Sequence, residues 1–465
     1  MFKQSLSLPL KAAITAFVIV ASSLSILPTA KAQHGGSEQL IRVTWQDAKD
    51  KSLHWGEFVK VGPSIVFQNQ GKVAGFPTLG DSQSLGTMKR IDNMLVLGVR
   101  GGSQGQPQGG WLAVDLKVTE QLHGDHSDYT YGDAPHVTLT ALNDSRKYPI
   151  HLYEYNKEFY MANDPLNGFT RIDPNKLMAG GDDALGVFYR GGGGHITMAA
   201  VNKKVGYSTW MGSTESGKGK IDVIDLAKPG EGSIAYSIES PTPGLHGAIT
   251  NSGRVFMAPA DGIVWVDADL DLSQSAESVK INHLSLGKNP QDEQPYRTGA
   301  FTDHKDWVFF LAGEDKDAGL YMIQASASTP SVSKLLIETK PGLRLGMPEC
   351  VTALSGRDYA MAFQSKRAGD AVEQLTIIDL DPNQDRDFSD AKIQTSIDVG
   401  SGLVEGYRSY HSISFCDDEA YAVFTNPADG EICLLSLDKL KVVSRQKVGG
   451  VPTGIIAIGG EASKH

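Results

Sequence analysis

Four histidines hold the same position in a pattern that recurs along this 465-residue chain. In each case a histidine opens a short apolar segment, a polar turn follows, and a second apolar segment returns. The four are His151, His195, His246 and His411. Imidazole nitrogen is a good ligand for Zn²⁺, and three or four imidazoles around one ion form a common zinc site. A single histidine of this kind is usually a hydrogen-bonded core residue, but four in one phase favour metal binding.

A second group of possible ligands lies in the segment LHGDHSDY. His123 and His126 are three residues apart, and Asp125 and Asp128 are interleaved with them. Gly124 favours a loop over a helix at this point. The two imidazoles and two carboxylates, Asp125 among them, could bind a divalent ion or pass one to the other histidines. A solvated polar loop would have the same composition, so both interpretations stay open.

The segments that must position these histidines read as repeated β-hairpins. Short apolar runs alternate with turns rich in Asn, Asp and Gly, and the chain contains 51 glycines. Successive units open 44 to 62 residues apart. Three or four strands per unit at such a period predict an all-β fold, the β-propeller. The first strand of each blade lines the central channel, so the histidines should gather at one rim. His151, His195 and His246 come from neighbouring blades, and His411 approaches from across the ring.

The two ends of the chain predict how the ring closes. The C-terminal VPTGIIAIGG resembles a first strand without its hairpin partner, and the N-terminal strands lack such a first strand. Pairing them would remove the open sheet edges. Seven complete units and this composite unit give eight blades. Seven blades is the alternative if residues 33–83 decorate the ring instead.

Residues 1–32 have the features of a secretory signal peptide. Lysines precede an apolar run too short for a comfortable membrane span, and Ala30-Lys31-Ala32 supplies the small residues of a cleavage site. We therefore expect export, cleavage near Ala32 and one propeller domain over 33–465 that is not an integral membrane protein. Removing the leader takes away three lysines and no acid, so the net charge falls by three, from −11 to −14. An acidic surface argues against nucleic acid as a partner.

The sequence offers little support for nucleophilic catalysis. No GxSxG nucleophile elbow between a strand and a helix and no HExxH helix is found, and no glycine-rich phosphate loop leads from a strand into a helix. The three cysteines form no CxxC pair, which excludes a thiolate zinc site of the finger type. Arg297 and Glu349 hold the histidine phase in two intervening blades, where they could form an ion pair or support a ligating imidazole.

These motifs together resemble the AztD-type periplasmic zinc metallochaperones. The resemblance rests on LHGDHSDY, then KYPIHLYEYNKEFYMAN, then GLHGAI and the terminal VGGVPTGIIAIGG, in that order along most of the chain. His123 and His126 match the HGDH motif, His151 the P-x-H histidine and His246 the LHG histidine, whereas His195 and His411 match less closely. The resemblance implies a periplasmic β-propeller that holds Zn²⁺ and delivers it to the zinc-binding protein of an ABC importer. The N-terminal segment QHGGSEQ departs from the histidine- and aspartate-rich tail of many members.

The sequence therefore predicts a non-enzymatic protein that holds Zn²⁺ at a histidine-rich rim and passes it on by ligand exchange. Two alternatives stay open. One is a metal-dependent propeller hydrolase or lactonase, for which Asp125 or Glu349 would be the base. The other is a protein- or glycan-binding propeller whose histidines are structural.

Overall fold

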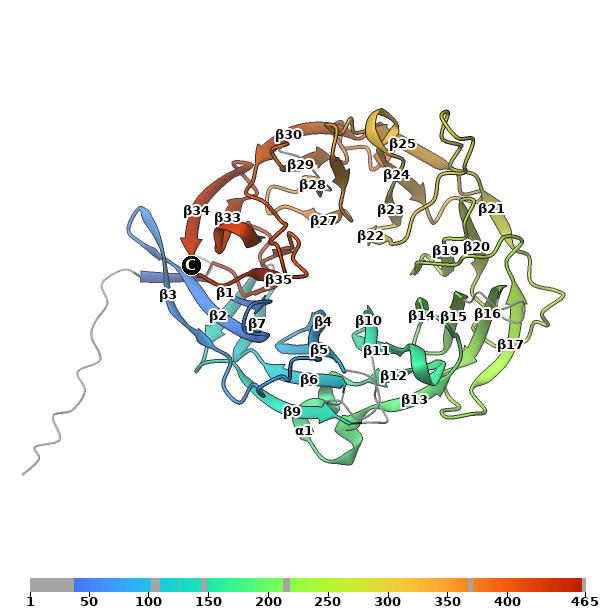
Figure 1. Ribbon diagram of the computed structural model, residues 1–465, viewed down its shortest axis with the longest axis horizontal. Coiled ribbons are helices and arrows are strands. Elements are labelled where there is room, and N and C mark those ends of the chain that lie inside the picture. Colours follow the sequence, from blue (N-terminus) through green and yellow to red (C-terminus); the bar gives the residue numbers. More distant parts are fainter. Residues whose placement is uncertain are drawn as a thin grey trace, which may run out of the picture.

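Eight sheets surround a central channel in the computed structural model (Figure 1). The expected all-β propeller with eight blades is confirmed, and the seven-bladed alternative is wrong. The predicted leader and Asp125 lie outside the residues that the structure describes. Those residues are 37–101, 109–124, 126–143, 149–211, 218–366 and 371–461.

The first four blades follow the chain in order, each from its channel strand outward. Blade one contains β4 (Ser84–Ile91), β5 (Met94–Arg100), β6 (Gly110–Asp115) and β9 (His136–Leu142). Blade two contains β10 (Pro149–Tyr155), β11 (Glu158–Asn163), β12 (Gly168–Ile172) and β13 (Val187–Arg190). Blade three contains β14 (Met198–Val201), β15 (Val205–Met211), β16 (Lys218–Asp225) and β17 (Ile234–Glu239). Blade four contains β18 (Ala248–Asn251), β19 (Arg254–Met257), β20 (Ile263–Asp267) and β21 (Asn282–Leu284).

The next three blades repeat this order. Blade five contains β22 (Thr302–His304), β23 (Trp307–Ala312), β24 (Gly319–Gln324) and β25 (Val332–Leu336). Blade six contains β27 (Glu349–Thr352), β28 (Asp358–Lys366), β29 (Gln374–Asp379) and β30 (Lys392–Asp398), and β26 (Leu343–Leu345) also pairs with β28. Blade seven contains β31 (Ile413–Phe415), β32 (Tyr421–Asn426), β33 (Glu431–Ser436) and β34 (Lys441–Lys447).

The eighth blade joins the two ends of the chain. In it β35 (Pro452–Ile458) is the channel strand, followed outward by β1 (Ser37–Asp47), β2 (Ser52–Val61) and β3 (Ser64–Lys72). The antiparallel pairing of β1 with β35 confirms the predicted closure. Arg42 of β1 is fully buried, forms an ion pair with Glu57 at 2.6 Å and donates to the carbonyls of Leu116 and Gly132. It thereby ties the closing blade to blade one.

Local sequence explains the hairpins that build each blade. Asn156 and Lys157, which join β10 to β11, both have positive φ angles, as do Asn202 and Lys203 between β14 and β15. Two-residue turns of this type match the right-handed twist of the strands they connect. The second strands lie between neighbouring blades, and every residue of β11 is buried. The core is therefore a ring of sheet-to-sheet contacts.

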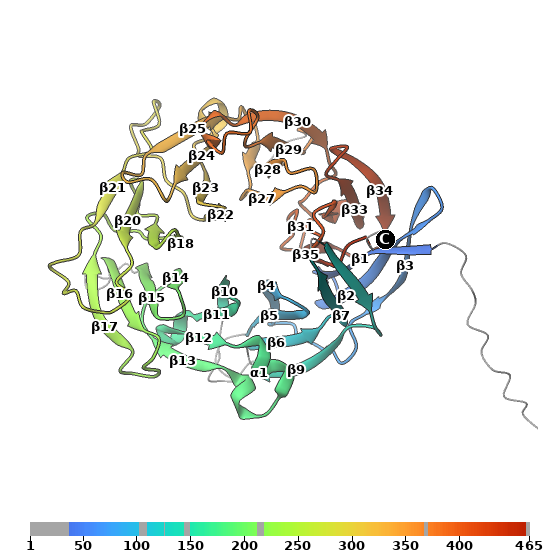
Figure 2. The same ribbon diagram turned by 180° about the vertical axis from the view of Figure 1, so that it is seen from behind.

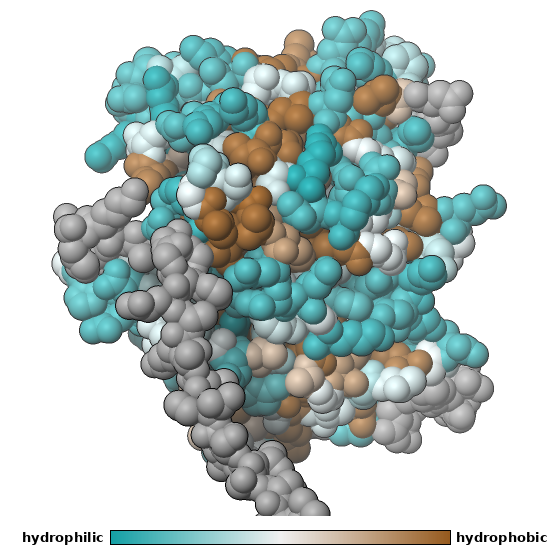
Figure 3. All heavy atoms as spheres, turned by 90° about the vertical axis from the view of Figure 1, so that its left-hand side faces the viewer, coloured by the Kyte–Doolittle hydropathy of each residue, from teal (hydrophilic) through white to brown (hydrophobic). Residues whose placement is uncertain are grey.

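Helices contribute little to this architecture. The described chain contains one α-helix, α1 (Pro174–Ala179), and short 3-10 turns such as η2 (Asp164–Leu166). None of the helices in the described ranges is long and apolar enough to cross a membrane. On the side of the ring shown in Figure 3, hydrophilic side chains are interspersed with apolar ones.

A two-stranded hairpin is inserted between the third and fourth strands of blade one. It consists of β7 (Val118–His123) and β8 (His126–Tyr131), and it crosses in front of the closing blade in Figure 2. Tyr131 fastens it there by donating to the carbonyl of Leu40 at 3.0 Å and accepting from the amide of Gly460. His123 and His126 of the HGDH motif therefore pair across this hairpin, and Gly124 has a φ of 64°.

Candidate metal centre

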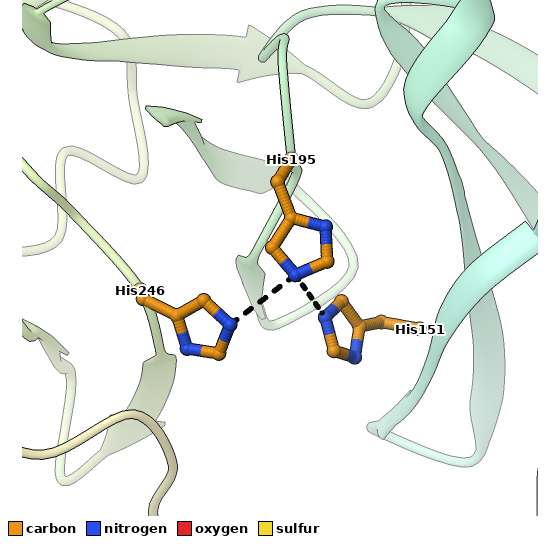
Figure 4. Close-up of side chains that lie close together, drawn as sticks. All are labelled: His151, His195 and His246. Carbon is orange, nitrogen blue, oxygen red and sulfur yellow. Dashed lines mark hydrogen bonds between the residues drawn. The ribbon is translucent and has the colours of Figure 1, made fainter. Parts of the chain in front are cut away.

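Three of the four phased histidines converge at one rim of the channel. His151, His195 and His246 come from three consecutive blades, and their rings point toward one another (Figure 4). The Nε2 atom of His195 lies 2.9 Å from Nε2 of His151 and 3.2 Å from Nε2 of His246. All three rings are half-buried. This arrangement presents three nitrogen ligands to one point.

An irregularity in β10 directs the His151 side chain. Pro149 pairs with Asn163 and Leu152 with Met161, and the register shifts between these two pairs. Such a bulge re-aims a side chain relative to a regular strand. Pro149 also packs against the backbone of blade one, since a β-carbon added to Gly98 would lie 3.6 Å from its ring.

The glycine run that precedes His195 lets the chain pass very close to blade three. A β-carbon on Gly192 would lie 2.3 Å from the Ser208 hydroxyl, and one on Gly193 would lie 2.3 Å from the Trp210 ring. Gly192 also has a φ of 78°, which favours glycine. The glycine-rich loop thus packs against β15, the second strand of the same blade. This contact fixes where His195 leaves the loop.

His246 is held by a loop of the next blade. Its Nδ1 donates to the carbonyl oxygen of Gly299 at 2.8 Å. Gly247 has a φ of 109°, and a β-carbon there would lie 3.1 Å from the backbone of Gly299. The His-Gly pair of the LHG motif thus permits the close approach that this hydrogen bond needs. Arg297, two residues before Gly299, donates to the carbonyl of Gly244.

Hydrogen bonds on the outer ring nitrogens orient two of the imidazoles. Nδ1 of His195 lies 2.9 Å from a carboxylate oxygen of Asp164, whose other oxygen accepts from the amide of Ile196. Nδ1 of His246 is bound to Gly299 as described. When Nδ1 carries the proton, Nε2 carries a lone pair, and these lone pairs face inward. Carboxylate and carbonyl partners of this kind support metal-binding histidines.

Burial favours the neutral form of two of the imidazoles, those of His151 and His246. Desolvation, reinforced by the neighbouring His195 and His246, lowers the pKa of His151 to about 4. Desolvation also lowers the pKa of His246, against the opposing effect of its hydrogen bond to Gly299. Metal ions bind the neutral imidazole, so protons compete weakly with a metal here near neutral pH.

Two of the three nitrogen separations are compatible with a tetrahedral ion that has one open position. Zinc–nitrogen bonds of about 2.0–2.1 Å place the ligand nitrogens of a tetrahedron about 3.3 Å apart. The two observed separations, 2.9 and 3.2 Å, need only small adjustments to reach that value. Three protein ligands leave the fourth position to water or an incoming group. His151 also lines a channel cavity of about 900 Å³, through which such a group could enter.

The structure places His411 away from this cluster, on blade seven. Its Nε2 lies 3.1 Å from a carboxylate oxygen of Glu373, and its Nδ1 lies 2.6 Å from the carbonyl oxygen of Thr425. Its ring is stacked on Phe363. Both nitrogens face oxygen acceptors, so neither lone pair is directed at a metal. The approach across the ring that the sequence predicted for His411 does not occur.

The HGDH histidines also stay apart from the cluster. His123 ends β7, lies opposite His126 in the hairpin register, and has its Nε2 3.4 Å from a carboxylate oxygen of Asp128. Asp125 lies outside the described residues. Within the described ranges, the other group close enough to share an ion is Asp47, Asp50 and His54. That group is internally satisfied, because Asp50 binds Lys72 and His54 while Asp47 accepts two backbone amides.

Sequence reasoning missed the two groups that orient His195 and His246. Asp164 opens a turn in the blade before His195, and Gly299 follows the phased Arg297. An acidic residue immediately after the second strand of the preceding blade was the available signal for Asp164. The described ion pairs do not include one between Arg297 and Glu349, and Glu349 lines the channel. Cys350, Cys416 and Cys433 are free.

Comparison with solved structures gives similar propellers. The chain superimposes on AztD from Citrobacter koseri with a TM-score of 0.61 and 16% identity, over 92% of this chain and 100% of that chain. The apo form of AztD from the same organism gives a TM-score of 0.59 at 16% identity over the same shares. A putative 6-phosphogluconolactonase from Bacteroides fragilis aligns over 90% of this chain and 98% of that one, but a TM-score of 0.46 and 9% identity are too low to bear on activity. No protein-family model matches the chain, and no curated protein matches it in sequence.

At 16% identity the similarity establishes the fold. The AztD-like propeller agrees with the family resemblance of the sequence motifs, and both cover most of the chain. The three converging histidines are an independent observation, made on this chain alone.

Proposed function

We propose that this protein is an exported zinc-binding metallochaperone. It holds Zn²⁺ between His151, His195 and His246 and transfers the ion to the zinc-binding protein of an ABC transporter. The observation that carries the proposal is the convergence of three Nε2 atoms from three blades. The motif resemblance and the similarity to the AztD fold support the choice of zinc and of the partner.

Transfer proceeds by ligand exchange at the open fourth position. Hydrogen bonds from His195 to Asp164 and from His246 to Gly299 keep these two imidazoles in place as the ion arrives and leaves. An imidazole or carboxylate of the partner enters the fourth position, and the histidines of this chain are then released one at a time. Three neutral ligands bind more reversibly than a closed thiolate site would.

Location in the periplasm is part of this proposal. It rests on the leader-like residues 1–32 and on the family resemblance. HGDH residues His123, His126 and Asp125 have a separate role here, as a candidate capture site on the β7–β8 hairpin. His411 is proposed to act through the packing of blade seven, because Glu373 and Thr425 already occupy its nitrogens.

A metal-dependent hydrolase is the second candidate function. The observation in its favour is that Glu349 lines the same cavity as His151, with its pKa raised by burial. A raised pKa is common in catalytic carboxyl groups. Glu349 does not belong to the group of side chains close enough to share an ion with the histidines. Turnover of lactone or ester substrates by the zinc-loaded protein would favour this function.

Metal content of untagged protein tests the main proposal. We expect close to one zinc per chain after incubation with zinc and desalting, measured by mass spectrometry. The double variant His151→Ala, His246→Ala should lose that zinc. His283→Gln is the matched control, because His283 lies on the outer strand β21 beside Asp261. Zinc-loaded protein should then lose its ion to a periplasmic zinc-binding protein faster than free dissociation allows. Absence of zinc from the wild type contradicts the proposal.

A further inference from the structure

A smaller cavity adjoins the channel cavity that His151 lines. Its volume is about 280 Å³. Four cationic side chains from three separate segments line it, namely Lys49, Lys51, Arg100 and Arg408. The lysines belong to the β1–β2 turn, Arg100 ends β5, and Arg408 lies in the loop before β31. A cavity with this lining attracts anions.

The absence of carboxylates from this lining is unusual for the chain. The protein has 54 acidic and 43 basic residues, yet none of the described residues that line the cavity is acidic. Asp47 and Asp50 are close in sequence to the lysines but do not line the cavity; Oδ1 of Asp47 accepts two backbone amides, and Asp50 pairs with Lys72. Glu405 precedes Arg408 in its loop and is not part of the lining. None of the described lining residues supplies a negative charge to the cavity.

Two of the four cationic side chains are available to bind a ligand. Among the described residues, no hydrogen bond or ion pair uses the side chain of Lys49 or Arg408. Lys51, by contrast, is held by the carbonyls of Gly80 and Asp81. Arg408 follows Gly406, which has a φ of 81°, and is exposed at the mouth of the cavity. A ligand could thus gain new charge-assisted hydrogen bonds without breaking existing ones.

The cavity shares a wall with the channel that His151 faces. Gln46, Thr87 and Tyr410 line both spaces. The cationic cavity therefore adjoins the space that His151 lines, and Arg100 belongs to the blade next to that of His151.

We infer that this cavity binds a small organic anion with two or three carboxylate groups. Guanidinium and ammonium groups on separate segments suit carboxylates that are spread over a short carbon skeleton. The volume lies just below the roughly 300–1,000 Å³ of pockets that hold drug-sized ligands, so the ligand is small. Apolar Ala48 and Leu85 in the lining would contact such a skeleton.

Anion binding and metal binding should strengthen each other. A bound anion reduces the repulsion that Arg100 exerts on a cation at His151. By thermodynamic linkage, the factor by which the anion raises zinc affinity equals the factor by which zinc raises anion affinity. This coupling rests on the proposed function, whereas anion binding by the metal-free protein does not.

Titration of the metal-free mature protein tests the anion site. Succinate and tricarballylate are suitable probes because they carry the proposed groups, and inorganic phosphate is the comparison ligand. We expect calorimetry at low salt to show binding of one of the carboxylates, weakened at least roughly ten-fold in Lys49→Gln, Arg408→Gln because charge-assisted hydrogen bonds are lost. The control Arg344→Gln removes an exposed arginine that lines a separate cavity. This variant should bind the carboxylates like the wild type.

Three results would overturn the anion site. They are no carboxylate binding by the wild type, equal binding by the Lys49→Gln, Arg408→Gln protein, or tighter binding of phosphate than of either carboxylate. The His151→Ala, His246→Ala variant should retain anion binding, so a failure of the zinc proposal does not affect this test.

A competition titration with a zinc-binding dye tests the coupling. Saturating succinate should raise the zinc affinity of the wild type by roughly 5-fold or more, within the usual range for coupled sites. It should have no effect on the Lys49→Gln, Arg408→Gln protein. An unchanged zinc affinity in the wild type overturns the coupling.

Discussion

His411 and the three clustered histidines occupy the same sequence phase and reach opposite outcomes. Glu373 of blade six and the carbonyl oxygen of Thr425 in blade seven contact the two ring nitrogens of His411. In blades two to four, the hydrogen bonds are on Nδ1 of His195 and His246, and the Nε2 atoms face one another. The position in the repeat brings a histidine to the channel strand. The partner supplied by a neighbouring loop then decides whether it becomes a ligand or a packing residue.

The largest predicted difference between the surroundings of His411 and the three-histidine cluster concerns the free energy of unfolding. Glu373 and His411 side chains are each 1% exposed, and hydrogen bonds from His411 and Ser401 hold the pKa of Glu373 below its usual range despite its burial. Glu373→Ala removes one partner of this buried pair and should cost about 3–5 kcal/mol of unfolding free energy. Chemical denaturation measures it. Zinc affinity at the cluster should stay unchanged, and a parallel loss of zinc would break the comparison.

The next largest effect should be on zinc affinity alone. Asp164→Asn keeps an oxygen for the Ile196 amide but removes the charge beside Nδ1 of His195. Changes of this kind at histidine-supporting carboxylates cost roughly 10–100-fold in metal affinity. A competition titration gives the value. Asp261→Asn, beside the outer His283, is the control. Equal zinc affinity in Asp164→Asn and the wild type would mean that this carboxylate does not support the site.

The pH dependence of stability should report on His151. Its pKa is about 4 in the folded protein, against about 6.5 for an unperturbed histidine. The unfolded state therefore binds more protons between pH 6.5 and 4, and the unfolding free energy of the metal-free protein falls across that window. For this half-buried group the loss is on the order of 2 kcal/mol. Denaturation of His151→Gln should show a shallower decline, and identical pH profiles would contradict the assigned environment.

The smallest effect should come from the loop that holds His246. A β-carbon on Gly299 would lie 3.0 Å from Nδ1 of His246, so Gly299→Ala must shift the imidazole by a few tenths of an ångström. Zinc affinity should fall by a few-fold, with little change in the denaturation midpoint. Gly232→Ala is the matched control, because nothing lies within 4 Å of a β-carbon there. A larger loss than in Asp164→Asn would reverse the order expected from the hydrogen bonds.

The ring itself could be predicted because each repeat carries its own evidence. The first hairpin turn of successive blades is marked by residues such as Asn156 and Asn202. The start of the channel strand is marked by the phased histidines. The orphan C-terminal strand predicted the closure. Partners from other blades were harder to assign, because Asp164 and Glu373 lie 31 and 38 residues from the histidines they contact. No local spacing distinguishes such a carboxylate from an exposed one. The sequence could not predict that Arg100 and Arg408 line one cavity for the same reason, because only the folded ring brings them together.

X-ray absorption at the zinc edge of the loaded protein tests the central claim most directly. Three imidazoles and one light-atom ligand at about 2.0–2.1 Å are expected in the wild type. His195→Ala should lower the imidazole count or abolish zinc binding, because His195 contacts both other rings. Zinc coordinated by sulfur, or an imidazole count that His195→Ala leaves unchanged, would contradict the claim that these three histidines hold the ion.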